Sequence, residues 1–140
     1  MNYEAQRDYV NENNPFMCLC GITVTSVNKD TATAELNASS EFFNPGGTLH
    51  GGAFYTLADA AATTAARTDG CRYATIDGSI QYHRAITAGK VIATAVIRHR
   101  GKTLCSAAVE VTDENGKLLA DAAFSIFRLA PIDHPAFRSE

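Results

Sequence analysis

The segment from His50 to Arg67 constrains this chain more than any other, because Asp59 is the only ionisable side chain between its two ends. The other residues are almost all Ala, Leu, Phe, Tyr and Thr, and two glycines stand at the start. Alanine favours helix, and glycine weakens a helix least at its first turn. Because the segment is apolar on nearly all sides, the pattern predicts a helix that is buried over most of its surface. Gly70 is predicted to end this helix.

Asp59 stands out within this apolar helix. An unpaired carboxylate buried in such a place costs several kcal/mol, and proteins tolerate that cost mainly where chemistry needs the group. Asp59 is therefore a candidate catalytic residue. The alternative is that it lies with Thr56 and Thr63 on a narrow polar strip that faces solvent.

The composition is that of a globular protein and predicts one domain over residues 1–140, with 46% hydrophobic and 19% charged residues. A net charge of −3 gives no electrostatic footprint for nucleic acid. Residues 1–14 have no apolar core of a signal peptide, and no apolar run is long enough to span a bilayer. These features predict a cytoplasmic protein without nucleic-acid or membrane partners.

The cysteines and histidines show no spacing typical of metal ligands. The cysteines at 18, 20, 71 and 105 include no CxxC pair, and the histidines at 50, 83, 99 and 134 form no HxxxH or HExxH motif. The sequence therefore predicts four reduced thiols in apolar positions, with no metal and no other cofactor.

The chain outside the apolar helix alternates between strand-like runs and turns. A short amphipathic helix is expected over residues 3–13, within an N-terminal helical segment spanning 1–17, and an irregular tail over 131–140. Runs rich in β-branched residues predict strands at 20–28, 31–38, 73–83, 90–99, 103–112 and 118–129. Residues 39–49, with one proline and two glycines, are predicted to form a loop.

Two turns connect the last three strands: Arg100-Gly101-Lys102, and Asp113 to Gly116, whose Asn-Gly pair favours a tight hairpin. The resulting order is β-β-α-β-β-β-β. It predicts an α+β fold in which a mostly antiparallel sheet curls around one long helix.

A motif at the start of the helix carries a family resemblance. Asn44-Pro45-Gly46-Gly47-Thr48-Leu49-His50-Gly51-Gly52, followed by Leu57-Ala58-Asp59, resembles the hotdog-fold acyl-CoA thioesterases of the phenylacetate-degradation (PaaI-like) type. The HGG-(x)4-LxD spacing is specific, and the resemblance extends over most of the chain. It implies a hotdog fold, a thioester hydrolase acting on acyl-CoA, and assembly as a homodimer or a dimer of dimers.

The resemblance also implies catalytic roles. Asp59 matches the catalytic carboxylate, which acts as general base or as nucleophile, and Gly51 matches the residue whose backbone N–H polarises the thioester carbonyl. An unpaired N–H at a helix start suits that role; the alternative is that Gly51 and Gly52 only allow close packing at the helix entry. Asn44 matches a loop asparagine that places the water or thioester; its alternative is an Asx turn.

Two further positions match catalytic residues of the family less securely. His50 matches the motif histidine near the thioester, and it could equally be structural. Thr75 stands where some relatives hold the catalytic water with a hydroxyl. As a threonine in a β-branched strand it needs no functional explanation.

Spacing along the helix argues for a site shared between subunits. Eight residues separate Gly51 from Asp59, which is roughly 12 Å at about 1.5 Å per residue. Both cannot then act on one carbonyl, because catalytic groups must lie within about 3 Å of it. Two such helices packed antiparallel about a two-fold axis would bring Gly51 of one chain to Asp59 of the other.

Substrate contacts are predicted outside the catalytic groups. Gly52 lets the thioester approach, and Arg84, Arg100 and Lys102 are candidates for the phosphates of CoA, although a basic turn can also simply be solvated. Tyr55, with Phe42 and Phe43, could line the acyl pocket or belong to the core. Aryl and medium-chain aliphatic acyl groups both fit.

Two other functions share this fold class. One is a non-catalytic acyl-CoA-binding protein. Two features argue against it: the chain keeps Asn44, Gly51 and Asp59 together, and it has no DNA-binding extension. The other is a dehydratase or hydratase. Relatives of that kind pair a loop histidine with a helical glutamate, or place Asp and His in one short loop, and neither pattern is present.

Overall fold

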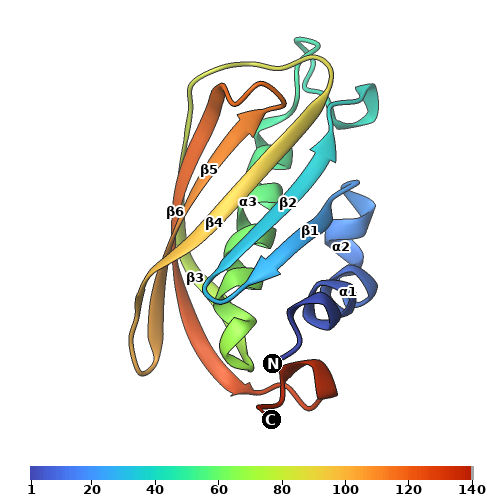
Figure 1. The fold of residues 1–140 in the computed structure, drawn as a ribbon. Coiled ribbons are helices and arrows are strands. Elements are labelled where there is room, and N and C mark those ends of the chain that lie inside the picture. Colours follow the sequence, from blue (N-terminus) through green and yellow to red (C-terminus); the bar gives the residue numbers. More distant parts are fainter. Residues whose placement is uncertain (140) are drawn as a thin grey trace.

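Two layers make up the structure, a curled antiparallel sheet and one long helix (Figure 1). The structure is a computed structural model that describes residues 1–139. The helices are α1 (Tyr3–Asn13), α2 (Pro15–Leu19) and α3 (Gly51–Ala66). The strands are β1 (Thr23–Asn28), β2 (Thr31–Asn37), β3 (Cys71–Tyr82), β4 (Lys90–Arg100), β5 (Leu104–Asp113) and β6 (Leu118–Pro131). This order confirms the predicted fold class.

The six strands lie in the order β1-β2-β4-β5-β6-β3, and every neighbouring pair is antiparallel. Register shifts interrupt β3 at Cys71/Tyr73 and Thr75/Asp77, and β4 at Ile97/His99. Such bulges bend a strand and increase its twist, which lets the sheet wrap around α3. β3 is left at one edge of the sheet, beside α3.

The helix α3 is buried because both it and the sheet present small side chains to one another. Its inner face packs against β2, β4 and β5. The facing strand positions are largely alanine: Ala32, Ala34, Ala93, Ala95, Ala107 and Ala120 are all at most 3% exposed. Alanine on both surfaces allows a close approach of helix and sheet at high packing density. Gly70, in the left-handed region at φ 92°, ends the 3-10 turn that follows α3, as the sequence predicted.

The two ends of the described chain pack against each other (Figure 1). The Asn2 N–H donates to the Ala136 carbonyl, and the Phe137 ring meets Tyr9 of α1 edge-on. The expectation of an irregular tail from residue 131 is wrong for part of that segment. Pro131 still belongs to β6, and Pro135–Phe137 form a 3-10 turn with Phe137 buried. Glu140 lies outside the described residues.

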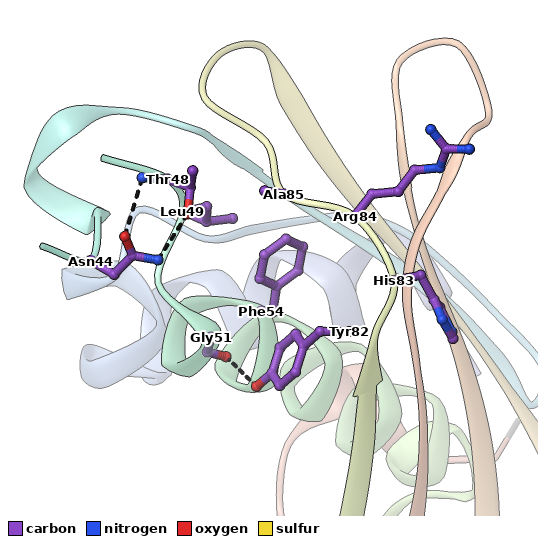
Figure 2. Close-up of a pocket in the computed structure, with 9 residues that line it drawn as sticks. All are labelled: Asn44, Thr48, Leu49, Gly51, Phe54, Tyr82, His83, Arg84 and Ala85. Atoms are coloured by element: carbon purple, nitrogen blue, oxygen red, sulfur yellow. Dashed lines mark hydrogen bonds between the residues drawn. The ribbon is translucent and has the colours of Figure 1, made fainter. Parts of the chain in front are cut away.

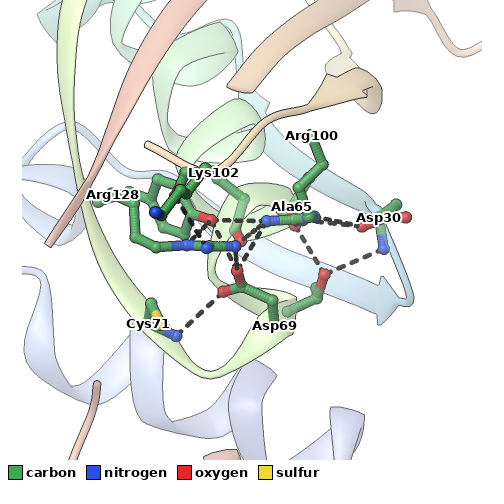
Figure 3. Close-up of polar contacts among 10 residues, drawn as sticks. Asp30, Ala65, Asp69, Cys71, Arg100, Lys102 and Arg128 are labelled. Atoms are coloured by element: carbon green, nitrogen blue, oxygen red, sulfur yellow. Dashed lines mark hydrogen bonds and ion pairs between the residues drawn. The ribbon is translucent and has the colours of Figure 1, made fainter. Parts of the chain in front are cut away.

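Arg100 is a second difference from the sequence-based expectation, which placed it in an exposed turn. β4 continues through Arg100, and its side chain, 20% exposed, lies beneath the C-terminal end of α3 (Figure 3). It donates to Asp30 Oδ1 at 2.7 Å, to the Ala66 carbonyl at 2.9 Å and to the Tyr73 hydroxyl at 2.8 Å. It thus donates a hydrogen bond to a helix-end carbonyl, and its positive charge is favourable at the negative end of the helix dipole.

Asp69 links this arginine to the far edge of the sheet (Figure 3). Its Oδ2 lies 3.1 Å from Arg100 and 2.6 Å from Arg128 of β6, and it accepts from the Tyr73 hydroxyl at 2.7 Å. Burial would lower the pKa of Arg100, but the hydrogen bond to Asp30 and the charge of Asp69 outweigh it and raise that pKa. We call Asp30, Asp69, Tyr73, Arg100 and Arg128 the arginine clamp. It ties the end of α3 to four strands or their turns.

We predict that Arg100→Met lowers the free energy of unfolding by about 2–4 kcal/mol, because two carboxylates and a helix-end carbonyl lose a charged donor. Urea unfolding at fixed protein concentration measures it. Arg98→Met, on an exposed side chain of the same strand, is the matched control and should stay within about 0.5 kcal/mol of the parent. Equal losses in both variants would contradict a structural role for Arg100.

Candidate active site

The first turn of α3 is built around His50. His50 is extended, at φ −62° and ψ 137°, and its Nδ1 accepts a hydrogen bond from the Gly52 N–H at 2.8 Å. The His50 carbonyl accepts from Ala53 at 2.9 Å. His50 is therefore the N-cap of α3, with Nδ1 unprotonated in this geometry. The imidazole thus has a structural role in capping the helix, which was the alternative to a role near the thioester.

Gly51 is left as the first helical residue, with a backbone N–H that has no hydrogen-bond partner within residues 1–139. Its carbonyl accepts from the Tyr82 hydroxyl at 2.7 Å. A Cβ on Gly51 would come within 3.0 Å of that hydroxyl oxygen, so glycine is what permits the tyrosine to close over the helix start. The helix dipole favours negative charge beside an N–H at this position.

A pocket of about 370 Å³ opens at this helix start (Figure 2). It lies between the loop before α3, the first turns of α3 and the segment that follows β3. Its lining residues are Asn44, Thr48, Leu49, Gly51, Phe54, Tyr82, His83, Arg84 and Ala85. Three of the predicted site residues, Asn44, Gly51 and Arg84, are thus brought to one cavity although they lie up to 40 residues apart in the chain.

Tyr82 is a pocket residue that the sequence analysis missed. Its ring meets Phe54 edge-on with centroids 5.8 Å apart, and burial raises the pKa of its hydroxyl. His83 also lines the pocket and pairs with Asp121. The run Tyr82-His83-Arg84 at the end of a predicted strand was the signal available in the sequence. That this run crosses the start of α3 follows only from the path of β3 in the structure.

Asn44 holds the loop that precedes α3. Its Nδ2 donates to Thr48 Oγ1 at 2.8 Å, its backbone N–H donates to the Thr48 carbonyl at 2.8 Å, and its carbonyl accepts from Gly47. Asn44 therefore closes a tight turn, as its structural alternative suggested. The same half-buried side chain lines the pocket beside Gly51 (Figure 2), so the turn also fixes the amide at the cavity wall.

Asp59 lies farther along α3, against β3. Thr75 Oγ1 donates to Asp59 Oδ1 at 2.7 Å, which joins two predicted site residues from different elements. The carboxylate is half-buried, and Thr63 beside it is 8% exposed with its hydroxyl bonded to the Asp59 carbonyl. The alternative of a solvent-facing strip of Asp59, Thr56 and Thr63 is therefore wrong, because Thr63 is buried.

The remaining predicted site residues lie apart from the pocket. Gly52 is packed against the His50 ring, where a Cβ would come 3.0 Å from Nδ1. Tyr55 stacks edge-on against Phe124, and its hydroxyl lies over Gly78. Arg100 is held in the arginine clamp, so a phosphate contact would have to compete with Asp30 and Asp69. Lys102 is exposed in the same turn.

The described residues contain no cluster of three or more His, Cys, Asp or Glu side chains that could hold a metal ion. Within the same residues no helix is both long and apolar enough to cross a membrane.

Comparison with known families assigns the chain to a superfamily. Residues 46–120 match the thioesterase superfamily, a range that covers α3 and the pocket wall from Leu49 to Ala85. The chain belongs to this superfamily, and its fold is the hotdog fold that the sequence predicted.

Individual relatives and structures fit that assignment. Acyl-coenzyme A thioesterase 13 of Mus musculus is 33% identical over 103 residues, covering 71% of this chain and 74% of that protein. Acyl-coenzyme A thioesterase PaaI of Escherichia coli is 27% identical over 110 residues, covering 78% and 79%. The structure of the latter superposes with a TM-score of 0.86 over 91% of this chain and 94% of that one, at 22% identity in the superposition.

A mutant structure of the phenylacetic acid degradation protein PaaI from Thermus thermophilus is similar as well. It is 32% identical, with a TM-score of 0.78, and covers 83% of this chain and all of that one. The PaaI-like resemblance seen in the HGG-(x)4-LxD motif is thereby confirmed.

We predict that His50→Ala lowers the free energy of unfolding by about 1 kcal/mol, because the Gly52 N–H loses its cap. His50→Asn, with a side chain that also caps well, should stay close to the parent in stability and in turnover. Thermal and urea unfolding of both variants measure the first effect. A His50→Asn protein of parental stability but without activity would show that the imidazole is needed for chemistry.

Proposed function

We propose that this protein is an acyl-CoA thioesterase that hydrolyses aryl or medium-chain acyl-CoA to the free acid and CoA. The observation that carries the proposal is the unpaired Gly51 N–H at the start of a buried helix, opening into a pocket beside Asn44. The thioester carbonyl is assigned to that N–H. Superfamily membership and the names of the relatives support the substrate class.

The second catalytic group is Asp59. Its Oδ1 is held by Thr75, which leaves Oδ2 as the oxygen that receives a proton or attacks carbon. As a general base it takes a proton from water while the water oxygen bonds to the thioester carbon. The carbonyl oxygen becomes an oxyanion that accepts from Gly51. The tetrahedral intermediate then collapses, which breaks the C–S bond, and the thiolate of CoA takes the proton from Asp59.

A nucleophilic route uses the same groups. Asp59 Oδ2 attacks the thioester carbon and forms a mixed anhydride, the thiolate leaves, and water then cleaves the anhydride to release the acid and restore the carboxylate. Both routes need Asp59 ionised and Thr75 as donor. The choice between them does not alter the residues assigned.

The site is shared between two copies of the chain in this proposal. Asp59 is not among the residues lining the pocket with Gly51, and the two residues are eight positions apart on one helix, roughly 12 Å along its axis. The strand beside Asp59, β3, is a 12-residue edge strand on which Ile76 is 59% exposed. An unpaired edge of this kind is a template for another strand. Pairing of β3 with a second β3 is therefore the contact we assign to the dimer.

Arg84 is the proposed contact for the CoA phosphates. It lines the pocket and makes no ion pair in the part of the chain that the structure describes (Figure 2). Among the three basic residues predicted for this role, it is the one whose position adjoins the proposed thioester site. Lys102 stays a candidate from its exposed turn, and Arg100 is better explained by the arginine clamp.

The direct test is release of free thiol from a panel of aryl and aliphatic acyl-CoA substrates. We expect turnover in the presence of EDTA, and a loss of about 10²-fold or more in kcat for Asp59→Asn, because the amide cannot take a proton. Thermal unfolding of the variant serves as its folding control. Parental turnover by folded Asp59→Asn would refute the catalytic role, and thiol release at background from every substrate would refute the proposed function.

A further inference from the structure

A second cavity, of about 440 Å³, lies at the other end of α3 from the pocket of Figure 2. α1, the end of α3, β3 and β6 all contribute to its wall. Val10, Leu129 and Ile132 are apolar lining residues, while Asn13, Arg67 and Arg72 provide polar groups. A lining that combines apolar and cationic side chains suits a ligand that has an apolar part and an anionic group.

Arg67 is the cation that makes this cavity unusual. Four other arginines, at 7, 100, 128 and 138, each pair with an aspartate. Arg67 is half-buried, yet its guanidinium takes part in no hydrogen bond or ion pair within residues 1–139. Burial lowers the pKa of Arg67, and the charge of Asp59 opposes this shift only in part. A desolvated guanidinium is unfavourable without an anionic partner.

Arg72 reaches the same cavity from β3. Successive residues of a regular strand point to opposite faces, yet Arg72 and Tyr73 both line the cavity. The pairing with β6 is irregular at this point: Cys71 pairs with Pro131 and Tyr73 with Arg128, so β6 has one more residue than β3 between these two pairs. Two arginines from two elements thus line one cavity, and guanidinium groups bind carboxylates through charge-assisted hydrogen bonds.

The cavity lies beyond the end of a row of groups that contains the proposed catalytic carboxylate. Asp59, Thr63 and Arg67 recur every four residues on one face of α3, and Thr75 and Tyr73 lie two residues apart on the facing strand. Arg67 is about 12 Å beyond Asp59 along the axis, and its side chain leans back toward the helix start. An acyl group whose carbonyl is at Asp59 would extend along this row into the cavity.

We infer that this cavity is an acyl-end subsite that selects acyl-CoA substrates bearing a carboxylate at the far end of the acyl chain. Arg67 is the main contact and Arg72 the second. An extended chain advances roughly 1.2 Å per C–C bond, so acyl chains of about six to eight carbons span roughly 6–8 Å. That length suits the axial separation once it is shortened by the Arg67 side chain, which leans back toward Asp59. The inference rests on the proposed thioesterase function and specifies its substrate class.

The test compares substrates that differ only at the end of the acyl chain. kcat/KM is measured for suberyl-CoA against octanoyl-CoA and for adipyl-CoA against hexanoyl-CoA, with the full-length protein, Arg67→Gln and Arg72→Gln. Arg98→Gln, on the exposed face of β4, is the matched control. Binding of free suberate, followed by titration calorimetry, reports the cavity without any turnover.

We expect the protein to prefer the carboxylated substrates by about tenfold or more, since charge-assisted hydrogen bonds to a carboxylate are strong. Arg67→Gln should remove that preference, and weaken suberate binding, while changing octanoyl-CoA hydrolysis less than about twofold. Arg98→Gln should change neither.

Three outcomes would overturn the inference. One is equal or better use of octanoyl-CoA by the unmodified protein, a result that does not depend on whether any variant folds. Another is a loss in Arg67→Gln that is the same for both substrates. The third is suberate binding that Arg67→Gln leaves unchanged. Absence of hydrolysis with every acyl-CoA would instead refute the proposed function, and the calorimetry then judges the cavity alone.

Discussion

The burial of α3 against the concave face of the sheet is the interaction on which the rest of the structure depends. Alanines on the helix and on β2, β4 and β5 allow a distance at which larger side chains would not fit. The arginine clamp then fixes the far end of the helix, and His50 caps the near end. A helix held at both ends places the Gly51 N–H and the Asp59 carboxylate at defined points along one rigid axis.

The same packing explains why the polar groups lie where they do. The sheet covers the helix on the β2, β4 and β5 side, so a carboxylate can remain only toward the edge strand β3, where Thr75 donates to it. The two cavities lie near the two ends of α3, one by Gly51 and one by Arg67. In the proposed shared site the thioester lies between Gly51 of one chain and Asp59 of the other, and the acyl end follows α3 and β3 of the chain that provides Asp59.

The sequence predicted those features that depend on local pattern. An alanine-rich run with one carboxylate gave the buried helix, β-branched runs and Asn-Gly gave the strands and turns, and the HGG-(x)4-LxD spacing gave the superfamily. Contacts between distant segments were beyond such patterns. Arg100 reads as a basic turn residue until β4 is seen to bring it beneath α3. Tyr82 reads as a strand residue until its hydroxyl is found on Gly51.

The candidate site shows the same difference between local patterns and contacts of distant segments. Asn44 and Gly51 are close in sequence and belong to one motif, and both line one pocket. The Asp59–Thr75 contact spans 16 residues and joins a helix to a strand, so only the resemblance pointed to Thr75. Arg67 carried no sequence signal, because a single arginine at a helix end is ordinary until its lack of a partner is seen.

The central claim is that one active site draws on two chains. Differently tagged Asn44→Ala and Asp59→Asn chains, each inactive as a homodimer, are co-expressed and the mixed dimer is isolated through both tags. One of its two sites then carries both substitutions and the other carries neither. The account predicts thioesterase activity of about half the parental rate per dimer. Isolated mixed dimers as inactive as either parent would contradict it, placing Asn44 and Asp59 in the same chain's site.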